Sequence, residues 1–220
     1  MITDYTDKMK FTEEKLSWLR EKISATMSEK RFFHTAAVEK MAERIGEIYA
    51  PDKVDVLRAA GLLHDITKEY STEKQLQICR EFGIITTKQD ILTPKTFHAK
   101  TAALLIPIMY PEFADDEVIS AVRWHTTGNA EMTLLQKIVY LADYIDDSRK
   151  FEDCVKLRRI FWDACPEKMN KKERDIHLTK TLLVSFDMTL SGLIAENAPI
   201  SDDTFMARNS LIFSLCEEVK

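Results

Sequence analysis

The 220-residue sequence has few of the residues that interrupt helices, with only five glycines and six prolines. It also lacks long stretches in which apolar and polar residues alternate, the pattern that would indicate β-strands. Along most of the chain the apolar residues instead recur with a period near 3.6, as in amphipathic helices that pack on one another. The sequence therefore predicts an all-α fold.

Two further absences exclude classes of function. The four cysteines are widely spaced and form no Cys-x-x-Cys pair, so we expect reduced thiols at Cys79, Cys154, Cys165 and Cys216 rather than a zinc or redox site. The formal net charge of −5 gives no general attraction to polyanions, and we expect no nucleic-acid partner. Any affinity for phosphate must come from a local group of basic residues.

The sequence also contains no stretch near the roughly 18 consecutive apolar residues that indicate a membrane span. Its start, MITDYTDKMKFTEEK, has no apolar stretch behind a basic region, so we expect neither a signal peptide nor a membrane partner, and a cytoplasmic location. The length and the 45% of hydrophobic residues suit one domain over residues 1–220. We expect its core at about 29–150, with an N-terminal helix and the C-terminal helices packed on it.

Periodicity and capping residues predict the individual helices. We expect Ser28 to cap the second helix, and Thr72 with Gln75 to form a capping box for the fourth. We expect a loop over 83–96 and two or three more helices after residue 145. The helices predicted before residue 146 span about 13–27, 29–49, 51–65, 73–82, 98–110, 116–125 and 134–145.

Four of the five histidines and two aspartates form a candidate constellation around the adjacent pair His64-Asp65. Each of them alone could be an ordinary core or surface residue, and only the joint pattern indicates a site. Neutral imidazoles and carboxylates hold divalent metals, and a metal with open positions activates water, so the pattern points to hydrolysis. The fifth histidine, His177, lies in the charged run KKERDIHLTK and is expected to face solvent. The other members of the constellation are His34, His98, His125 and Asp143.

The segments around these residues carry a family resemblance. His34, the pair His64-Asp65 within GLLHDITKE, and Asp143 within YLADYIDDSR resemble the ligand pattern of the HD-domain metal-dependent phosphohydrolases. The segments RFFHT, FHAKTAA, WHTTG, KIVYLADYI with Arg149, and ARN resemble the YqeK-type bacterial enzymes, which hydrolyse diadenosine tetraphosphate symmetrically to two ADP. The match runs in order from about residue 29 to residue 209.

The resemblance implies an HD-domain helical bundle that holds a divalent metal, with iron the usual one. Manganese, cobalt or zinc would suit the same ligands. It assigns the metal to His34, His64, Asp65 and Asp143. The pair Asp146-Asp147 stands where Glu-Pro is common in the family, and the segment CPEKMNKKERD is lengthened; both differences are expected to alter the rim of the site.

The resemblance also assigns contacts with the substrate. Arg31 and Arg149 match phosphate contacts, although each could instead be a surface arginine. His98 and His125 match positions that face the phosphates or a second metal, and Thr126 is a further expected substrate contact. Lys68 is expected either to neutralise the transferring phosphoryl group or to be a solvated lysine paired with Glu69.

In the mechanism that this implies, Asp65 orients or bridges the attacking water, and His125 acts as general acid if one metal is bound. The substrate would be diadenosine tetraphosphate and the product ADP. The alternatives are another HD-type nucleotide phosphohydrolase and a non-enzymatic module that senses nucleotide and metal. The late apolar residues, which form either core or a homodimer surface, are Phe186, Met188, Leu190, Phe205, Ile212 and Phe213.

Overall fold

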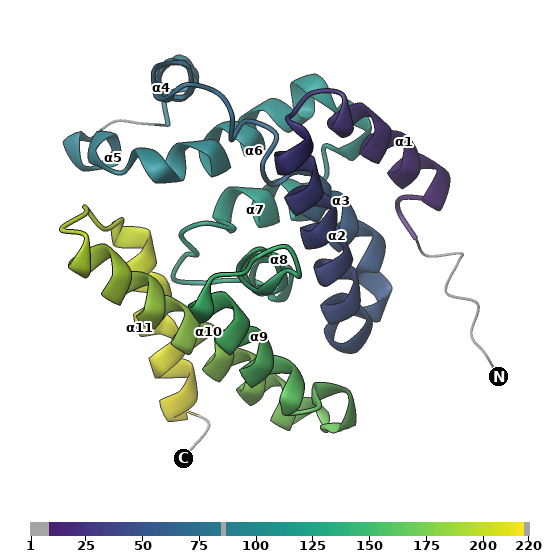
Figure 1. Cartoon of the computed structure of the whole chain (residues 1–220), viewed down its shortest axis with the longest axis vertical. Helices are drawn as coiled ribbons and strands as arrows, with labels where there is room; N and C mark the ends of the chain where they lie inside the picture. Colours follow the sequence, from purple (N-terminus) through teal and green to yellow (C-terminus); the bar gives the residue numbers. More distant parts are fainter. Residues whose placement is uncertain (1–8, 85–86, 218–220) are drawn as a thin grey trace.

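The computed structural model describes residues 9–84 and 87–217, which form eleven α-helices and no strand (Figure 1). The predicted all-α fold is therefore confirmed. The helices are α1 (Glu13–Ser24), α2 (Glu29–Tyr49), α3 (Val54–Leu63), α4 (Thr72–Glu81), α5 (Lys88–Leu92), α6 (Phe97–Met109), α7 (Asp116–Trp124), α8 (Leu134–Ile145), α9 (Glu152–Asp163), α10 (Lys171–Ala195) and α11 (Asp202–Glu217).

Capping side chains set the ends of the helices that carry the site. The Ser28 hydroxyl accepts a hydrogen bond from the Arg31 backbone N–H and starts α2 at its predicted position. Thr133 and Gln136 form a capping box that starts α8, whose bounds also match the prediction. Because these caps satisfy N–H groups that lack a partner within the helix, they fix where each helix begins.

Two local predictions are wrong. The side chain that caps α4 is Ser71, which accepts from the Lys74 N–H, so Thr72 is the first helical residue and does not form a box with Gln75. The segment 83–96, predicted to be a loop, contains α5, which a capping box of Thr87 and Asp90 starts. A five-residue helix is too short to show a periodic apolar pattern, and this explains why it was missed.

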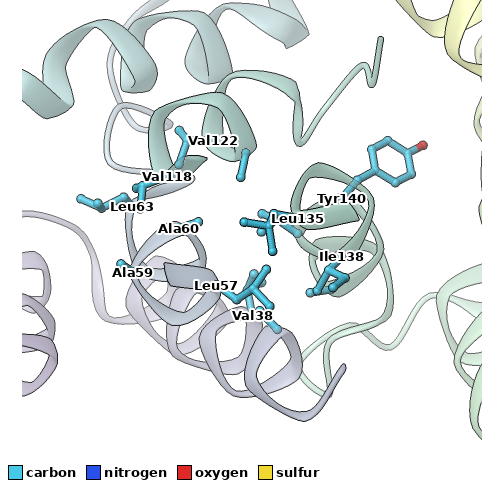
Figure 2. Packing of buried hydrophobic residues seen from close by; sticks show 14 of the residues in the cluster. Val38, Leu57, Ala59, Ala60, Leu63, Val118, Val122, Leu135, Ile138 and Tyr140 are labelled. Carbon is cyan, nitrogen blue, oxygen red and sulfur yellow. The ribbon is translucent and has the colours of Figure 1, made fainter. Parts of the chain in front are cut away.

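The core lies where α2, α3 and α7 pack around α8, which Figure 1 shows near the centre of the molecule. Figure 2 shows Val38 of α2, Leu57 of α3 and Ile138 of α8 pointing toward one another, and all three side chains are fully buried. Helix α1 packs on α2 and α3, while α10 packs on α8, α9 and α11. The helices that carry the site are thus held by a common apolar core.

The long helix α10 connects the C-terminal region to this core. In the described part of the chain it is the one helix long and apolar enough to cross a membrane, judged by length and composition alone. Its residues Leu178, Leu182 and Phe186 belong to the main core. Core helices of globular proteins share these properties, so one such helix is only a weak indication of a membrane span.

The C-terminal region differs from the sequence prediction at His177. Its ring is half-buried and stacks on Phe161 with 5.3 Å between ring centroids, and its Nε2–H donates to the Phe161 carbonyl oxygen at 3.0 Å. The prediction that His177 faces solvent is therefore wrong, because the packing of α10 on α9 covers one side of its ring. Of the late apolar residues, Phe186 and Leu190 are buried, whereas Phe205 and Phe213 are exposed.

Candidate metal centre and phosphate site

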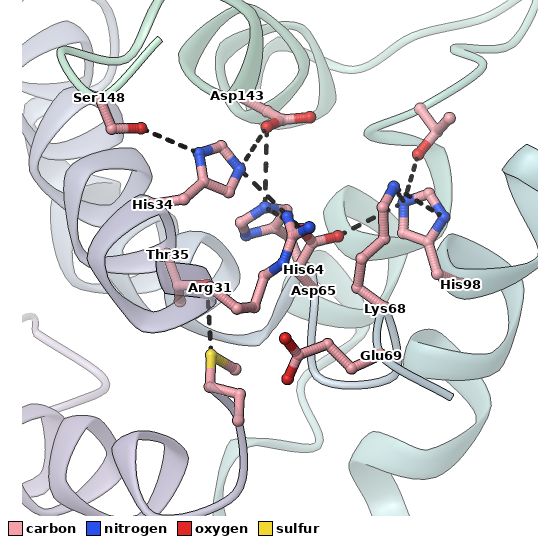
Figure 3. Close-up of polar contacts among 12 residues, drawn as sticks. Arg31, His34, Thr35, His64, Asp65, Lys68, Glu69, His98, Asp143 and Ser148 are labelled. Atoms are coloured by element: carbon pink, nitrogen blue, oxygen red, sulfur yellow. Dashed lines mark hydrogen bonds and ion pairs between the residues drawn. The ribbon is translucent and has the colours of Figure 1, made fainter. Parts of the chain in front are cut away.

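All of the residues predicted for the site come together in one region, although they come from five helices or the turns after them. Figure 3 shows those on α2, on α6, on α8 and in the turn after α3. Helix α2 supplies Arg31 and His34, and the turn after α3 supplies His64, Asp65 and Lys68. His98 lies in the first turn of α6, His125 and Thr126 follow α7, and Asp143 with Arg149 come from α8 and the turn after it.

A close approach of α2 to α3 positions the first two histidines. A Cβ atom on Gly61 would lie 2.8 Å from the Glu39 Cα, a distance that real Cβ atoms essentially never show. Glycine therefore lets the two helices pack backbone to backbone at this point. The ring centroids of His34 and His64 consequently lie 5.4 Å apart.

Backbone carbonyls fix the tautomers of two buried histidines. The Nδ1 atoms of His64 and His125 lie 2.7 Å from the carbonyl oxygens of Gly61 and Val122. Because a carbonyl oxygen only accepts, each Nδ1 carries the proton and each neutral ring keeps a free lone pair on Nε2. This is the arrangement in which histidine binds a metal through Nε2.

His34 is held between two carboxylates. Its Nε2 lies 3.0 Å from Asp143 Oδ1, and its Nδ1 lies 3.3 Å from both Asp146 Oδ2 and Ser148 Oγ. Burial lowers the pKa of His34, but the contacts with Asp143 and Asp146 outweigh this effect and hold the pKa at about 9. Asp146 thus orients His34 from behind.

This role of Asp146 was not predicted from the sequence. The Asp146-Asp147 pair was expected to alter the rim of the site, yet the Asp146 side chain is fully buried beneath His34. The sequence feature that could have predicted it is the spacing of the two aspartates. Asp146 follows Asp143 by three residues, which puts both carboxylates on one side of the helix end.

Asp65 lies at the middle of the constellation. Its Oδ2 is 3.5 Å from His64 Nε2, while its Oδ1 is 3.5 Å from His98 Nε2 and 3.9 Å from His125 Nε2. Burial opposes ionisation of this carboxyl, but the neighbouring His64, His98 and Lys68 hold its pKa well below the usual value. The carboxylate can therefore bridge two groups of ligands.

The donor set fits a divalent metal. Two buried atoms that face this centre, His64 Nε2 and Asp65 Oδ1, have no hydrogen-bond partner within the described chain, and His34 Nε2 faces carboxylate oxygens of Asp143 and Asp65. Such atoms normally cost free energy unless a ligand satisfies them. Two sets of ligand atoms lie within 4.8 Å of one another, namely His34, His64 and Asp143, and His64, Asp65 and His125.

Cationic side chains surround this donor set. Arg31 Nη1 lies 2.6 Å from Asp65 Oδ2, and Arg149 Nη2 lies 2.5 Å from Asp143 Oδ1. Neither arginine is therefore an isolated surface residue. The carboxylate of Asp143 raises the pKa of Arg149, and the charge of Arg149 contributes to the lowered pKa of Asp143, although burial of that carboxyl opposes the effect.

Lys68, His98 and Thr126 form a third polar group. Lys68 Nζ lies 3.1 Å from His98 Nε2, which also lies 3.0 Å from Thr126 Oγ1 and 3.1 Å from His125 Nε2. Lys68 is not paired with Glu69, whose carboxylate accepts from the Ser28 N–H at 2.8 Å. Burial lowers the pKa of Lys68, of His98 and, to about 4, of His125.

Two cavities of about 570 Å³ adjoin the metal centre, and Arg149 lines both. The first, lined also by Arg31, His34 and Phe151, is called the arginine cavity below. The second, lined also by Lys68, His98 and Asp143, is called the lysine cavity. Because Arg149 lines both, the two cavities lie on either side of one cationic side chain beside the donor set.

Comparisons with known proteins agree with this geometry. The model of the HD domain family matches residues 31–147, a segment that contains the donor set. The chain is 28% identical over 200 residues to the symmetrical bis(5'-nucleosyl)-tetraphosphatase of Bacillus subtilis, which covers 91% of this chain and 97% of that protein. It is 29% identical over 188 residues to the protein of the same name from Halalkalibacterium halodurans, covering 84% of this chain and 91% of that protein.

A solved structure is similar over nearly the whole chain. It is a crystal structure described as a "predicted HD superfamily hydrolase involved in NAD metabolism" from Clostridium acetobutylicum. The two chains share 31% sequence identity with a TM-score of 0.77, over 90% of this chain and 97% of that one. Together with the match of the family model over more than half of the sequence, this shows that the chain belongs to the HD domain family.

Proposed function

We propose that this chain is a metal-dependent phosphohydrolase that cleaves diadenosine tetraphosphate symmetrically into two ADP molecules. The observation that carries the proposal is a donor set with unpartnered buried ligand atoms directly beside Arg31 and Arg149. The names of the two relatives from Bacillus subtilis and Halalkalibacterium halodurans supply the substrate and the symmetry of cleavage.

His34, His64, Asp65 and Asp143 are the residues proposed to hold a divalent metal, with iron as our first choice. His98 and His125 are suited to a second position together with the other oxygen of Asp65, since Asp65 Oδ1 lies 3.5 Å from His98 Nε2 and 3.9 Å from His125 Nε2. When bound, such a metal lowers the pKa of a coordinated water to near 7 and so makes a nucleophile available at neutral pH.

The side chains of the protein orient the attacking water and the polyphosphate. Asp65 Oδ1, which has no partner within the described chain, is placed to accept a hydrogen bond from the water. The water oxygen bonds to one β-phosphorus while the bond from that phosphorus to the bridging oxygen breaks. The second ADP then leaves with the bridging oxygen, and the proton of the water is released to solvent.

Arg31, Arg149 and Lys68 provide positive charge for this step. Guanidinium groups pair with two phosphate oxygens at once, and fixed cations stabilise the charge that develops in the transition state. Thr126 and His98 lie beside Lys68 and are proposed to contact the phosphates. His125 is less suited to act as general acid than the sequence suggested, because its proton is on Nδ1 and is donated to Val122.

A product assay tests this proposal. Metal-loaded protein incubated with diadenosine tetraphosphate should yield ADP as the sole nucleotide product, whereas AMP plus ATP would contradict symmetrical cleavage. NAD belongs in the same assay, because the relative from Clostridium acetobutylicum is described as involved in NAD metabolism. Absence of turnover with all nucleotides tested would favour the alternative of a sensor module.

Asp65→Ala should lose bound metal and activity together, since the carboxylate faces both groups of ligands. Asp163→Ala, which removes an exposed carboxylate at the end of α9, is the matched control. Metal analysis and turnover should be measured on the same preparations. Full metal content with full turnover in Asp65→Ala would contradict the proposed site.

We further propose that the enzyme works in the cytoplasm as a single domain without a nucleic-acid partner. The four cysteines are free thiols, which suits a reducing compartment. The exposed Phe205 and Phe213 on α11 support a homodimer through this helix. Light scattering on the wild type and on Phe213→Ser should show a dimer that the substitution weakens.

A further inference from the structure

The arginine cavity has an unusual combination of side chains. Among the large apolar residues of the described chain, Phe151 and Phe33 are the two most exposed, at 72% and 68%. Both line this one cavity, together with Arg149 and His34. Neither ring stacks on another aromatic ring of the described chain. Exposed aromatic faces beside a site usually mark a surface that contacts a ligand.

The remaining residues of the cavity are mostly cationic. Lys30, Arg31, Arg149 and Lys150 line it, and no acidic residue of the described chain does. Arg31 and Arg149 therefore place positive charge beside the donor set, and the exposed rings of Phe33 and Phe151 line the same cavity. A nucleotide has the complementary order, with anionic phosphates joined through a ribose to a flat aromatic base.

The lysine cavity on the other side of Arg149 lacks this combination. Its aromatic rings are the buried His98 imidazole and Tyr70, and the ammonium of Lys74 already lies over the Tyr70 ring, 3.7 Å from the centroid. The face of Tyr70 is therefore occupied, whereas the faces of Phe33 and Phe151 are exposed. The two halves of a symmetrical dinucleotide would consequently meet different surroundings.

We propose that Phe33 and Phe151 form a base-binding site, in which the base of one nucleoside of the substrate stacks on one or both rings while its phosphates reach Arg31 and Arg149. The inference rests on the proposed function for the identity of the substrate. Stacking on a ring reads no hydrogen-bonding edge, so the site accepts different bases. These two residues position one half of the dinucleotide, and the other half lies in the lysine cavity without a stacked base.

Binding measurements test the site without requiring turnover. Phe33→Ala and Phe151→Ala should each raise the Kd for ADP, by roughly 5- to 150-fold for a fully stacked base. The Kd for tripolyphosphate, which has no base, should stay unchanged in both variants. Phe151→Trp should retain ADP affinity because it keeps a ring face. Phe82→Ala, which removes an exposed phenylalanine at the end of α4, is the matched control.

The outcomes separate the site from the function. Wild-type affinity for ADP in both alanine variants would overturn the base-binding site, as would an equal loss of tripolyphosphate affinity or no ADP binding by the wild type. If the variants bind ADP normally while diadenosine tetraphosphate is still cleaved, the function stands and the site fails. If ADP binding depends on the two rings but no cleavage occurs, the site stands and the function fails.

Discussion

Among single residues, His34 has the clearest consequence for pH dependence. Burial lowers its pKa, but Asp143 and Asp146 raise it to about 9, so in metal-free protein at pH 7.5 the ring carries a proton that a metal must displace. We expect about one proton to be released per metal bound, and metal affinity to rise with pH toward 9. Calorimetry in two buffers with different heats of ionisation measures this release.

The stability of metal-free protein should change in the opposite direction. A raised pKa means that protonation of His34 stabilises the fold fully below its ordinary pKa of about 6.5. This contribution is lost as the pH rises through about 9. His34→Gln should remove both the proton release and this loss of stability. Metal binding without proton release at pH 7.5 would contradict the assignment of His34 as a ligand.

Arg149 should affect substrate use more than metal content. Arg149→Ala removes a charged hydrogen-bond donor from the phosphates, worth about 1.5–3 kcal/mol, so kcat/KM should fall roughly 10- to 150-fold. Bound metal should be retained, because the residue is not a ligand. Steady-state kinetics and metal analysis measure the two effects. Arg159→Ala, an exposed arginine on α9, should change neither, and unchanged kinetics in Arg149→Ala would contradict the phosphate contact.

At the scale of single residues, the sequence predicted which histidines, aspartates and cationic residues belong to the site. It did not predict the contacts of Asp146 and His177. The role of Asp146 depends on a helix end that turns the carboxylate beneath His34, and the burial of His177 depends on packing against Phe161 of another helix. Neither contact leaves a local pattern in the sequence.

At the scale of the helix, the close contact of α2 and α3 predicts that adding one methyl group at Gly61 destabilises the protein. In Gly61→Ala the new Cβ would meet the Glu39 backbone at 2.8 Å, so the helices must move apart and carry His34 away from His64. We expect a loss of about 1–3 kcal/mol in the free energy of unfolding, together with weaker metal binding. Chemical denaturation and metal titration measure these effects.

Gly192→Ala is the matched control for this substitution. It also lies within a helix, but a Cβ there would meet nothing within 4 Å. Because alanine favours helix more than glycine does, Gly192→Ala should be neutral or stabilise the protein by up to about 1 kcal/mol. Equal stability of Gly61→Ala and Gly192→Ala would show that the contact of α2 with α3 does not constrain the site.

The bounds of the helices could be predicted where apolar periodicity and a capping residue agree, as in α2 and α8. The bounds were predicted wrongly, or the helix was not predicted, where only one of these two signals was clear. The cap of α4 is one residue earlier than predicted, because Ser71 and Thr72 are both capable of the same hydrogen bond. Helix α5 has a clear capping box at Thr87 but only five residues, so its capping signal lacked the support of periodicity.

For the whole molecule, removal of the metal should lower thermal stability. The proposed ligands join α2, the turn after α3, and α8, so a bound metal links helices that are distant in sequence. A ligand at 100 times its Kd stabilises the native state by about 2.7 kcal/mol, which corresponds to roughly 5–10 °C in Tm for a chain of this size. Calorimetry before and after treatment with a chelator measures the shift.

Readdition of the metal should restore the Tm, and Asp65→Ala should show no such shift. A Tm that does not depend on the chelator would contradict a metal site that joins these helices. Circular dichroism should show that helix content persists without metal, because the apolar core of α2, α3, α7 and α8 does not depend on the ligands.

The all-α fold and the HD domain family were predicted from the sequence and are confirmed. Apolar periodicity alone indicates helices but not their arrangement, so the convergence of His34, His64 and Asp143 was predicted through the family resemblance. The relatives' names agree with the activity that this resemblance implied. The single domain, the homodimer and the cytoplasmic location stay predictions, because a single chain does not test them.

The buried Asp146 carboxylate contacts two residues with different proposed tasks. Its Oδ2 lies 3.3 Å from His34 Nδ1 and 3.2 Å from Arg149 Nε. A shift in this carboxylate therefore reaches a metal ligand and a phosphate contact at once. Occupancy of one partner changes the affinity for the other by the same factor in both directions, as thermodynamic reciprocity requires. If His34 holds a cation and Arg149 a polyphosphate, we expect the two to bind as coupled ligands, because Asp146 and Asp143 each contact both residues.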